Sequence, residues 1–199
     1  MIASFIITFR ETLEAALIVG IILSYLVKTK ETKYNKVVYL GIFAGVVASI
    51  IGAIAFNELA HGFEGRAEEL FEGITMLIGA GLLTWMIFWM RSQASQFKTS
   101  LESDVHRAVT GGAVWGLFVL TFITVFREGV ETALFIGAAA FQTNAFDTLI
   151  GALIGLSLAV VIGYLIYAST VRLNIRLFFD VTSLLLLIFA AGLFMHGVH

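Results

Sequence analysis

Residues 9–20 read FRETLEAALIVG, and residues 126–137 read FREGVETALFIG. Seven of these twelve positions are identical, and both copies end in an apolar run. Each copy keeps an arginine followed directly by a glutamate, with a second glutamate three positions further on. Charged residues at matched spacing are not expected from apolar composition alone, so the chain is predicted to contain an internal repeat.

The composition around the two copies is that of a membrane protein. Hydrophobic types make up 59% of the 199 residues and charged types 13%, whereas soluble domains average about 45–50% and about 25%. This balance excludes an ordinary soluble enzyme and a disordered chain. The formal net charge of -2 predicts no binding of nucleic acid. The chain has no cysteine, which excludes disulfides, thiolate metal sites and cysteine nucleophiles.

Six apolar stretches are long enough to cross a hydrocarbon layer of ~30 Å. They cover about 2–27, 37–58, 69–90, 108–140, 146–171 and 177–197. The fourth stretch is too long for a simple span, so we expect it to tilt, extend into the cytosol, or break near Gly111-Gly112 or Gly129. Lysines and arginines gather in the loops after the first, third and fifth stretches, which the positive-inside rule makes cytoplasmic. We therefore expect a multi-pass protein of the inner (plasma) membrane with its N-terminus outside.

The predicted fold class is all-α, with one transmembrane domain made of two three-helix repeats. The units are a first repeat at 1–91, a cytoplasmic connector at 92–107 and a second repeat at 108–199. Because three is odd, the second repeat crosses the membrane upside down relative to the first, an arrangement typical of transporters with a midplane site. Glycines at four-residue spacing, Gly41 and Gly45 in one repeat and Gly151 and Gly155 in the other, are expected to allow close helix packing.

The charged residues inside the first and fourth spans form the candidate site. On a helix that turns ~100° per residue, an arginine and two glutamates at i, i+1 and i+4 lie on one face. Each ionisable group at membrane depth costs about 2.5–3.5 kcal/mol, so these side chains are expected to point into the bundle. If the two faces meet, the carboxylates offer hard oxygen ligands to a cation such as Ca²⁺, Mn²⁺ or Fe³⁺. The candidate metal ligands are Glu11, Glu14, Glu128 and Glu131, supported by the cationic side chains of Arg10 and Arg127.

The two motifs resemble those of the high-affinity iron permease family, also called the oxidase-dependent iron transporter family. The R-E-x-x-E signature reads RETLE at 10–14 and REGVE at 127–131, where the family often has R-E-G-L-E. The copies depart from that pattern at Thr12 and at Val130. A further family-like element is EELFE at 68–72, and the resemblance covers essentially the whole chain.

The resemblance implies a permease that moves iron, in the ferric state, across the cytoplasmic membrane into the cell. Iron is then the transported substrate and not a tightly bound cofactor, and the chain itself is not an enzyme. The implied partners are iron ions, the lipid bilayer and an extracytoplasmic oxidase or peroxidase, with no nucleic acid and with a homo-oligomer left open. Bacterial members of the family continue into a seventh helix, whereas this sequence ends at His199, close to the end of the expected sixth span.

The expected outer loop after the second span is strongly acidic. Its candidate residues for recruiting metal are Glu58, His61, Glu64, Glu68, Glu69 and Glu72. A cluster of one charge sign raises the local cation concentration, and the resemblance implies that the loop collects iron. The alternative is a solvated loop whose glutamates favourably start the third helix.

Other functions remain open from the sequence. The carboxylates suit another cation, such as lead or manganese, and they suit export as well as import. An intramembrane oxidoreductase with a metal centre is a second class, although neither motif contains a histidine. A structural membrane subunit is a third class, in which buried Arg–Glu pairs only fix helix register.

Overall fold

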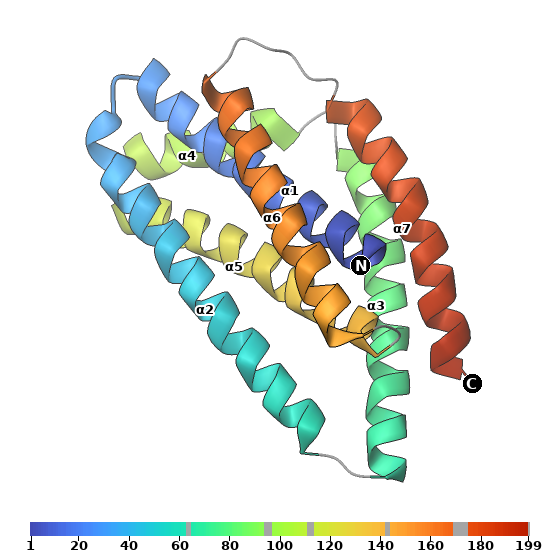
Figure 1. Ribbon diagram of the computed structural model, residues 1–199. Helices are drawn as coiled ribbons and strands as arrows, with labels where there is room; N and C mark the ends of the chain where they lie inside the picture. The colour runs from blue at the N-terminus through green and yellow to red at the C-terminus, as the bar shows by residue number, and fades with distance from the viewer. Residues whose placement is uncertain (63–64, 94–96, 111–113, 142–143, 169–174, 199) are drawn as a thin grey trace.

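The computed structural model describes residues 1–62, 65–93, 97–110, 114–141, 144–168 and 175–198, and every regular element in these ranges is a helix (Figure 1). In chain order the α-helices are α1 (Ile2–Lys28), α2 (Asn35–His61), α3 (Arg66–Gln93), α4 (Phe97–Thr110), α5 (Val114–Ala140), α6 (Ala145–Ala168) and α7 (Ile175–Val198). A short 3-10 turn, η1 (Thr32–Tyr34), leads into α2. Within the described residues, five of the six expected apolar stretches each fall on one long helix, and the fourth covers the end of α4 and all of α5.

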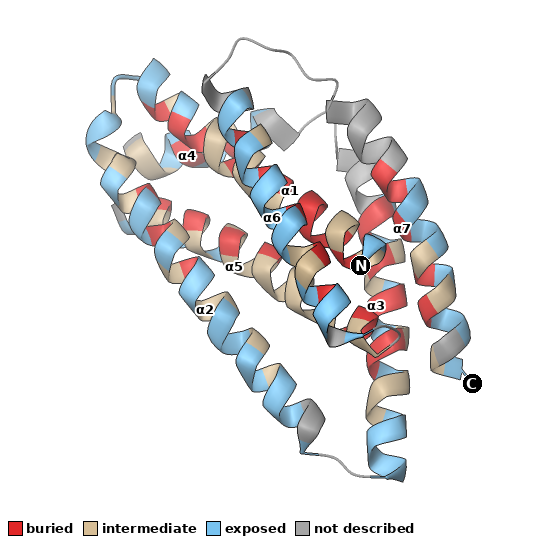
Figure 2. Cartoon of the chain, in the orientation of Figure 1, coloured by how far each residue is buried: buried red, intermediate tan, exposed pale blue. Residues whose placement is uncertain are grey.

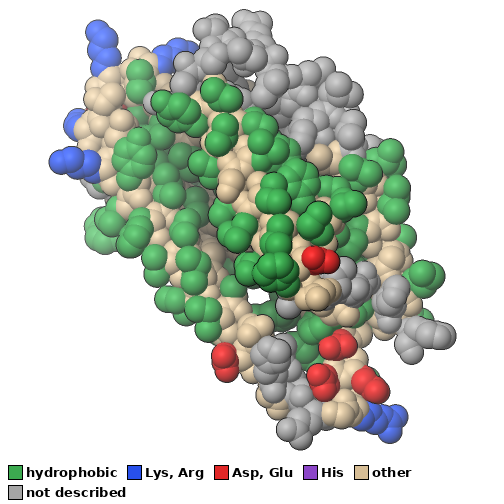
Figure 3. Space-filling model, in the orientation of Figure 1, with side chains coloured by type: hydrophobic (Ala, Val, Ile, Leu, Met, Phe, Trp, Pro, Cys, Tyr) green, Lys and Arg blue, Asp and Glu red, His purple; other side chains and the backbone are tan. Residues whose placement is uncertain are grey.

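Three segments in the described part of the chain are long and apolar enough to cross a membrane. They are Thr32–Leu59, Arg66–Phe88 and Phe146–Leu165, on α2, α3 and α6. The corresponding segment of α7, Thr182–Met195, is shorter. The visible flank of the molecule is covered mainly by hydrophobic side chains (Figure 3). This surface is consistent with a helical membrane protein, because large contiguous apolar surfaces are unfavourable in water and are stable against lipid.

The long fourth stretch is divided between two helices. α4 ends at Thr110 and α5 begins at Val114. Of the two positions considered for a break, Gly129 lies inside the continuous α5, and Gly111-Gly112 lie outside the described residues. α4 also takes up most of the expected connector, and it buries Leu101 and Val105 against the apolar cluster around α1 and α5.

The helices pack in pairs around two central helices, α1 and α5. The most extensive contacts join α1 with α6, α2 with α5, and α3 with α7, and α1 also packs against α5. Buried residues follow α1 along much of its length, whereas α2 and α6 are largely exposed (Figure 2).

Glycines explain the two closest pairs. A Cβ atom on Gly41 of α2 would lie 3.0 Å from the carbonyl oxygen of Phe118 on α5. A Cβ atom on Gly155 of α6 would lie 3.0 Å from the backbone nitrogen of Phe9 on α1. Backbones that approach this closely need small residues at the contact. The four-residue glycine spacing thus brings α2 and α6 onto the two helices that carry the charged motifs.

Candidate functional site

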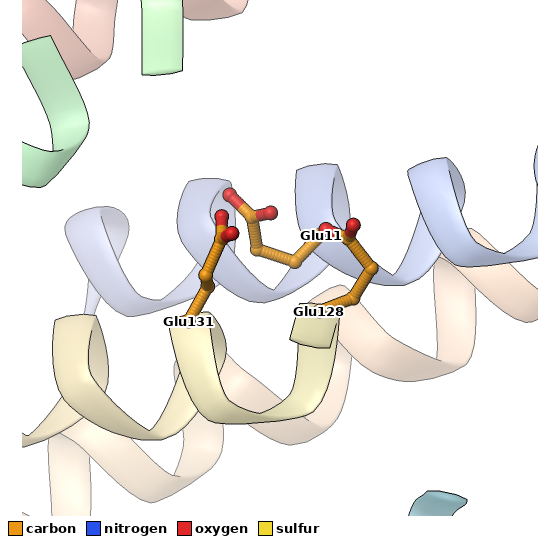
Figure 4. A group of neighbouring side chains, drawn as sticks. All are labelled: Glu11, Glu128 and Glu131. Carbon is orange, nitrogen blue, oxygen red and sulfur yellow. The ribbon is translucent and has the colours of Figure 1, made fainter. Parts of the chain in front are cut away.

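The packing of α1 against α5 brings the two charged motifs together. Oxygen atoms of Glu11, Glu128 and Glu131 all lie within 4.8 Å of one another (Figure 4). Glu128 and Glu131 are three residues apart on α5 and reach toward α1, which carries Glu11. Negative charges at this separation in a poorly solvated interior repel strongly unless positive charge lies among them.

Each arginine supplies positive charge to the glutamates of its own helix. The Arg10 guanidinium donates a hydrogen bond of 2.7 Å from Nη1 to Oε1 of Glu11. On α5, Nε of Arg127 donates to Oε1 of Glu131 at 2.9 Å and lies 3.7 Å from Oε1 of Glu128. Charge-assisted bonds of this kind hold a carboxylate in a fixed orientation. The two arginines therefore position three of the four expected ligands.

The fourth expected ligand, Glu14, is not part of the cluster of three. Its Oε2 atom lies 3.8 Å from Nη2 of Arg10. Glu14 is buried on α1, one helical turn from Glu11. This position makes it a neighbour of the carboxylate cluster that shares the positive charge of Arg10.

The two copies of the motif differ in burial. The Arg10 side chain is 0% exposed, whereas the Arg127 side chain is 39% exposed. The Glu131 side chain is also partly exposed, at 18%. The first motif is thus enclosed by protein, and the second motif is only partly enclosed.

Several carboxylate oxygens in this region have no donor. Within the described part of the chain, Oε2 of Glu11, Glu14, Glu128 and Glu131 is buried and accepts no hydrogen bond. A buried acceptor left without a partner costs about 1–3 kcal/mol, and such groups in native proteins call for a functional or ionic explanation. Oxygen donors of this kind are chemically suited to a hard cation.

The structure adds one contact that the sequence does not indicate. Nη1 of Arg10 also donates to the thioether sulfur of Met86 on α3 at 3.5 Å. Nothing in the apolar sequence of α3 distinguishes Met86 from its neighbours, so only the packing of α3 beside α1 identifies it. Thr124 and Thr132, which lie close to the second motif, donate to backbone carbonyls of their own helix. Their hydroxyl groups are therefore already engaged within the helix.

The acidic residues of the expected outer loop lie away from the cluster of three. Glu68 and Glu69 occupy the first turn of α3, and acidic side chains gather at the end of the molecule where α2 and α3 are joined (Figure 3). Glu58 precedes the end of α2, and Glu72 follows the first turn of α3. Glu64 and the side chain of His61 lie outside what the structure describes. Among the described residues, these glutamates do not form a group of three converging ligands.

Comparison with known proteins identifies the family. The model of the iron permease FTR1 family matches residues 1–199. This chain belongs to that family. Ferrous iron permease EfeU of Escherichia coli O6:H1 (strain CFT073) is 40% identical to this iron permease over 195 residues, which are 97% of this chain and 71% of the relative. The EfeU of Yersinia pestis is 39% identical over 195 residues, 97% of this chain and 69% of the relative. No solved structure matches the chain.

Family membership confirms the resemblance based on the two R-E-x-x-E motifs. It makes the chain an iron transporter with membrane-spanning helices, in agreement with the apolar α2, α3 and α6.

Proposed function

We propose that this iron permease moves iron through the place where α1 and α5 meet, with Glu11, Glu128 and Glu131 as ligands of the passing ion. The observation that carries the proposal is the approach of these three carboxylates, from two distant parts of the chain, to within 4.8 Å. Hard oxygen donors match the ligand preference of iron ions and other hard cations. The buried oxygens without a donor supply the remaining coordination.

Glu14 and the two arginines have supporting roles in this proposal. Glu14 lies one turn from Glu11 and accepts the ion as it leaves the three ligands. Arg10 and Arg127 orient the carboxylates and lower the repulsion among them when no ion is bound. Four glutamates and two arginines leave two formal negative charges, so the site attracts a cation without holding it irreversibly.

The oxidation state of the transported iron has two candidates. Ferric iron, the ion expected from the sequence, is the harder ion and suits ligands that are all oxygen. Ferrous iron balances the two formal negative charges of the site, and it is the ion named for the EfeU relatives. An uptake assay that supplies each ion separately distinguishes them.

Alternating access between two inverted repeats is the proposed transport mechanism. If the two repeats exchanged places, α1 would take the position of α5, α2 that of α6 and α3 that of α7. The α1–α6 contact would then become the α5–α2 contact, and the α3–α7 contact would stay as it is. These three contacts are the most extensive in the bundle. The difference in burial between Arg10 and Arg127 also supports it. Two motifs of equivalent sequence with different burial are expected when the two repeats adopt different conformations.

We also propose import, with the N-terminus outside. The loops rich in lysine and arginine then face the cytoplasm. The acidic end formed by α2 and α3 faces outward, where Glu58, Glu68, Glu69 and Glu72 raise the local concentration of cations. An extracytoplasmic oxidase or peroxidase would deliver iron to this end.

Uptake of radioactive iron into liposomes containing the purified protein tests the proposal. Wild-type protein is compared with Glu14→Gln and Glu131→Gln, with ferric chelate and ferrous iron supplied in parallel. We expect saturable uptake by the wild type and loss of uptake in both variants, because glutamine keeps the shape but removes the charge. Glu58→Gln, at the acidic end, serves as a matched control that keeps uptake at saturating iron. Unchanged uptake in both motif variants would refute the proposed route.

A further inference from the structure

An apolar cavity of about 210 Å³ lies between α2, α3 and α5. Its walls are Phe56 of α2, Leu134 of α5 and the face of α3 that runs from Phe71 to Gly79. Thr75 is the one polar residue in this wall, so the cavity offers almost no polar groups to an ion. An ion in this space would have to keep its own water.

The cavity lies between the acidic end of the molecule and the carboxylate cluster. Leu134 follows Glu131 by three residues on α5, so the two side chains share a face and are ~4.5 Å apart along the helix axis. At the other side of the cavity, Phe56 is two residues from Glu58, and Phe71 is next to Glu72. An ion that travels from the acidic end to Glu131 therefore meets the phenylalanines first, then the cavity, and then Leu134.

Two aromatic rings meet at the end of the cavity nearer Glu58 and Glu72, away from the carboxylate cluster. The ring centroids of Phe56 and Phe71 are 5.8 Å apart, with an angle of 39° between the ring planes. The ring of Phe56 also packs against α5 at Gly137, where an added Cβ would lie 2.8 Å from Cε1 of the ring. Phe56 thus connects α2 to both α3 and α5, although α2 and α3 make little other contact.

We propose that the Phe56–Phe71 pair is the outer gate of the iron pathway and that the cavity behind it is a vestibule for a hydrated ion. The proposal rests on the proposed route through Glu131. Apolar constrictions close to ions by losing their water, without being sterically sealed. Because liquid water occupies about 30 Å³ per molecule, an ion with its first shell of about six waters fits the vestibule once the gate is wet. Separation of α2 from α3 would part the two rings and admit water.

Cysteine accessibility tests the gate, because the chain has no cysteine of its own. Leu134→Cys places one thiol in the vestibule, and a charged thiol reagent that does not cross membranes is added to spheroplasts from outside. We expect slow modification in this background and about tenfold faster modification after Phe71→Ala, which removes one ring of the gate. Phe88→Ala, on the same helix at a residue that is 63% exposed, is the matched control and leaves the rate unchanged.

A second pair of variants protects the test against loss of folding. Phe56→Ala is compared with Phe43→Ala, which changes an exposed ring of α2, and each protein is first checked for a single peak in size-exclusion chromatography. Equal modification rates in the gate and control variants would overturn the proposal. Modification by an apolar maleimide alone would also overturn it, because the vestibule would then open to lipid. The thiol reaction does not depend on transport, so loss of the gate and loss of the Glu131 route are separate results.

Discussion

Replacement of Arg10 is expected to damage the protein far more than replacement of Arg127, although the two motifs are equivalent in sequence. Arg10→Met leaves Glu11 and Glu14 buried without their guanidinium partner. Removing one partner of a buried ion pair costs about 3–5 kcal/mol. Arg127 is 39% exposed, so the protein encloses its ion pairs less completely and Arg127→Met is expected to cost less, about 1 kcal/mol.

Thermal unfolding of the purified variants in detergent measures this difference. For a soluble chain of this size, 1 kcal/mol shifts the melting temperature by about 2–4 °C. On that scale Arg10→Met is expected to melt about 10 °C below Arg127→Met. The double variant Arg10→Met with Glu11→Gln removes the charge that the first change strands, so part of the loss is expected to return.

Equal melting temperatures for the two arginine variants would contradict the expected difference in stability. That result would mean that Arg10 is solvated as well as Arg127 in the folded protein. Failure of Glu11→Gln to recover any stability would show that the loss comes from packing, including the contact of Arg10 with Met86, and not from a stranded carboxylate.

Two further predictions concern glycines in the helices. Gly155→Ala is expected to lower the melting temperature, because its Cβ would lie 3.0 Å from the backbone nitrogen of Phe9. Gly52→Ala is expected to be neutral or stabilising by up to ~1 kcal/mol, because its Cβ would have no atom within 4 Å. A lower melting temperature for both variants would contradict this expectation. Gly129→Ala is expected to push α5 away from the Ser49 side chain on α2 and to reduce iron uptake, and Ser49→Gly in the same protein is expected to restore uptake by making room. Failure of the restoration would show that Gly129 is needed for another reason.

The helices and the two charged motifs were predictable, because their signals are local in the sequence. Apolar stretches long enough to cross a membrane stand out from the charged loops, and the repeated Arg-Glu-x-x-Glu pattern places its charges on one helix face. The same pattern indicated that both charged faces point into the bundle, because isolated charges facing lipid are costly. That the faces of α1 and α5 meet there was left as a condition and is seen only in the structure.

The differences between the two motifs were not predictable because they depend on packing between distant helices. The repeat treats Glu14 and Glu131 as equivalents, yet Glu131 joins the cluster of three and Glu14 lies beside it. The helix rise and the point at which α1 packs against α5 decide which glutamates meet. The enclosure of Arg10 likewise depends on its neighbours, among them Met86 of α3.

The gate has an equally weak sequence signal. Phe56 and Phe71 are two of 18 phenylalanines in the chain, and although Phe71 belongs to the EELFE element at 68–72, nothing in the sequence pairs it with Phe56. Their contact depends on how α2 and α3 approach each other at the acidic end.

Equilibrium binding of iron to the purified protein is the most direct test of whether α1 and α5 bind one ion jointly. The wild type is compared with Glu11→Gln on α1 and Glu131→Gln on α5, and the stoichiometry and affinity are measured in each. We expect one ion per cluster in the wild type and a strong loss of affinity for that ion in either variant. Unchanged affinity in both variants, or two ions of which each variant removes one, would contradict it.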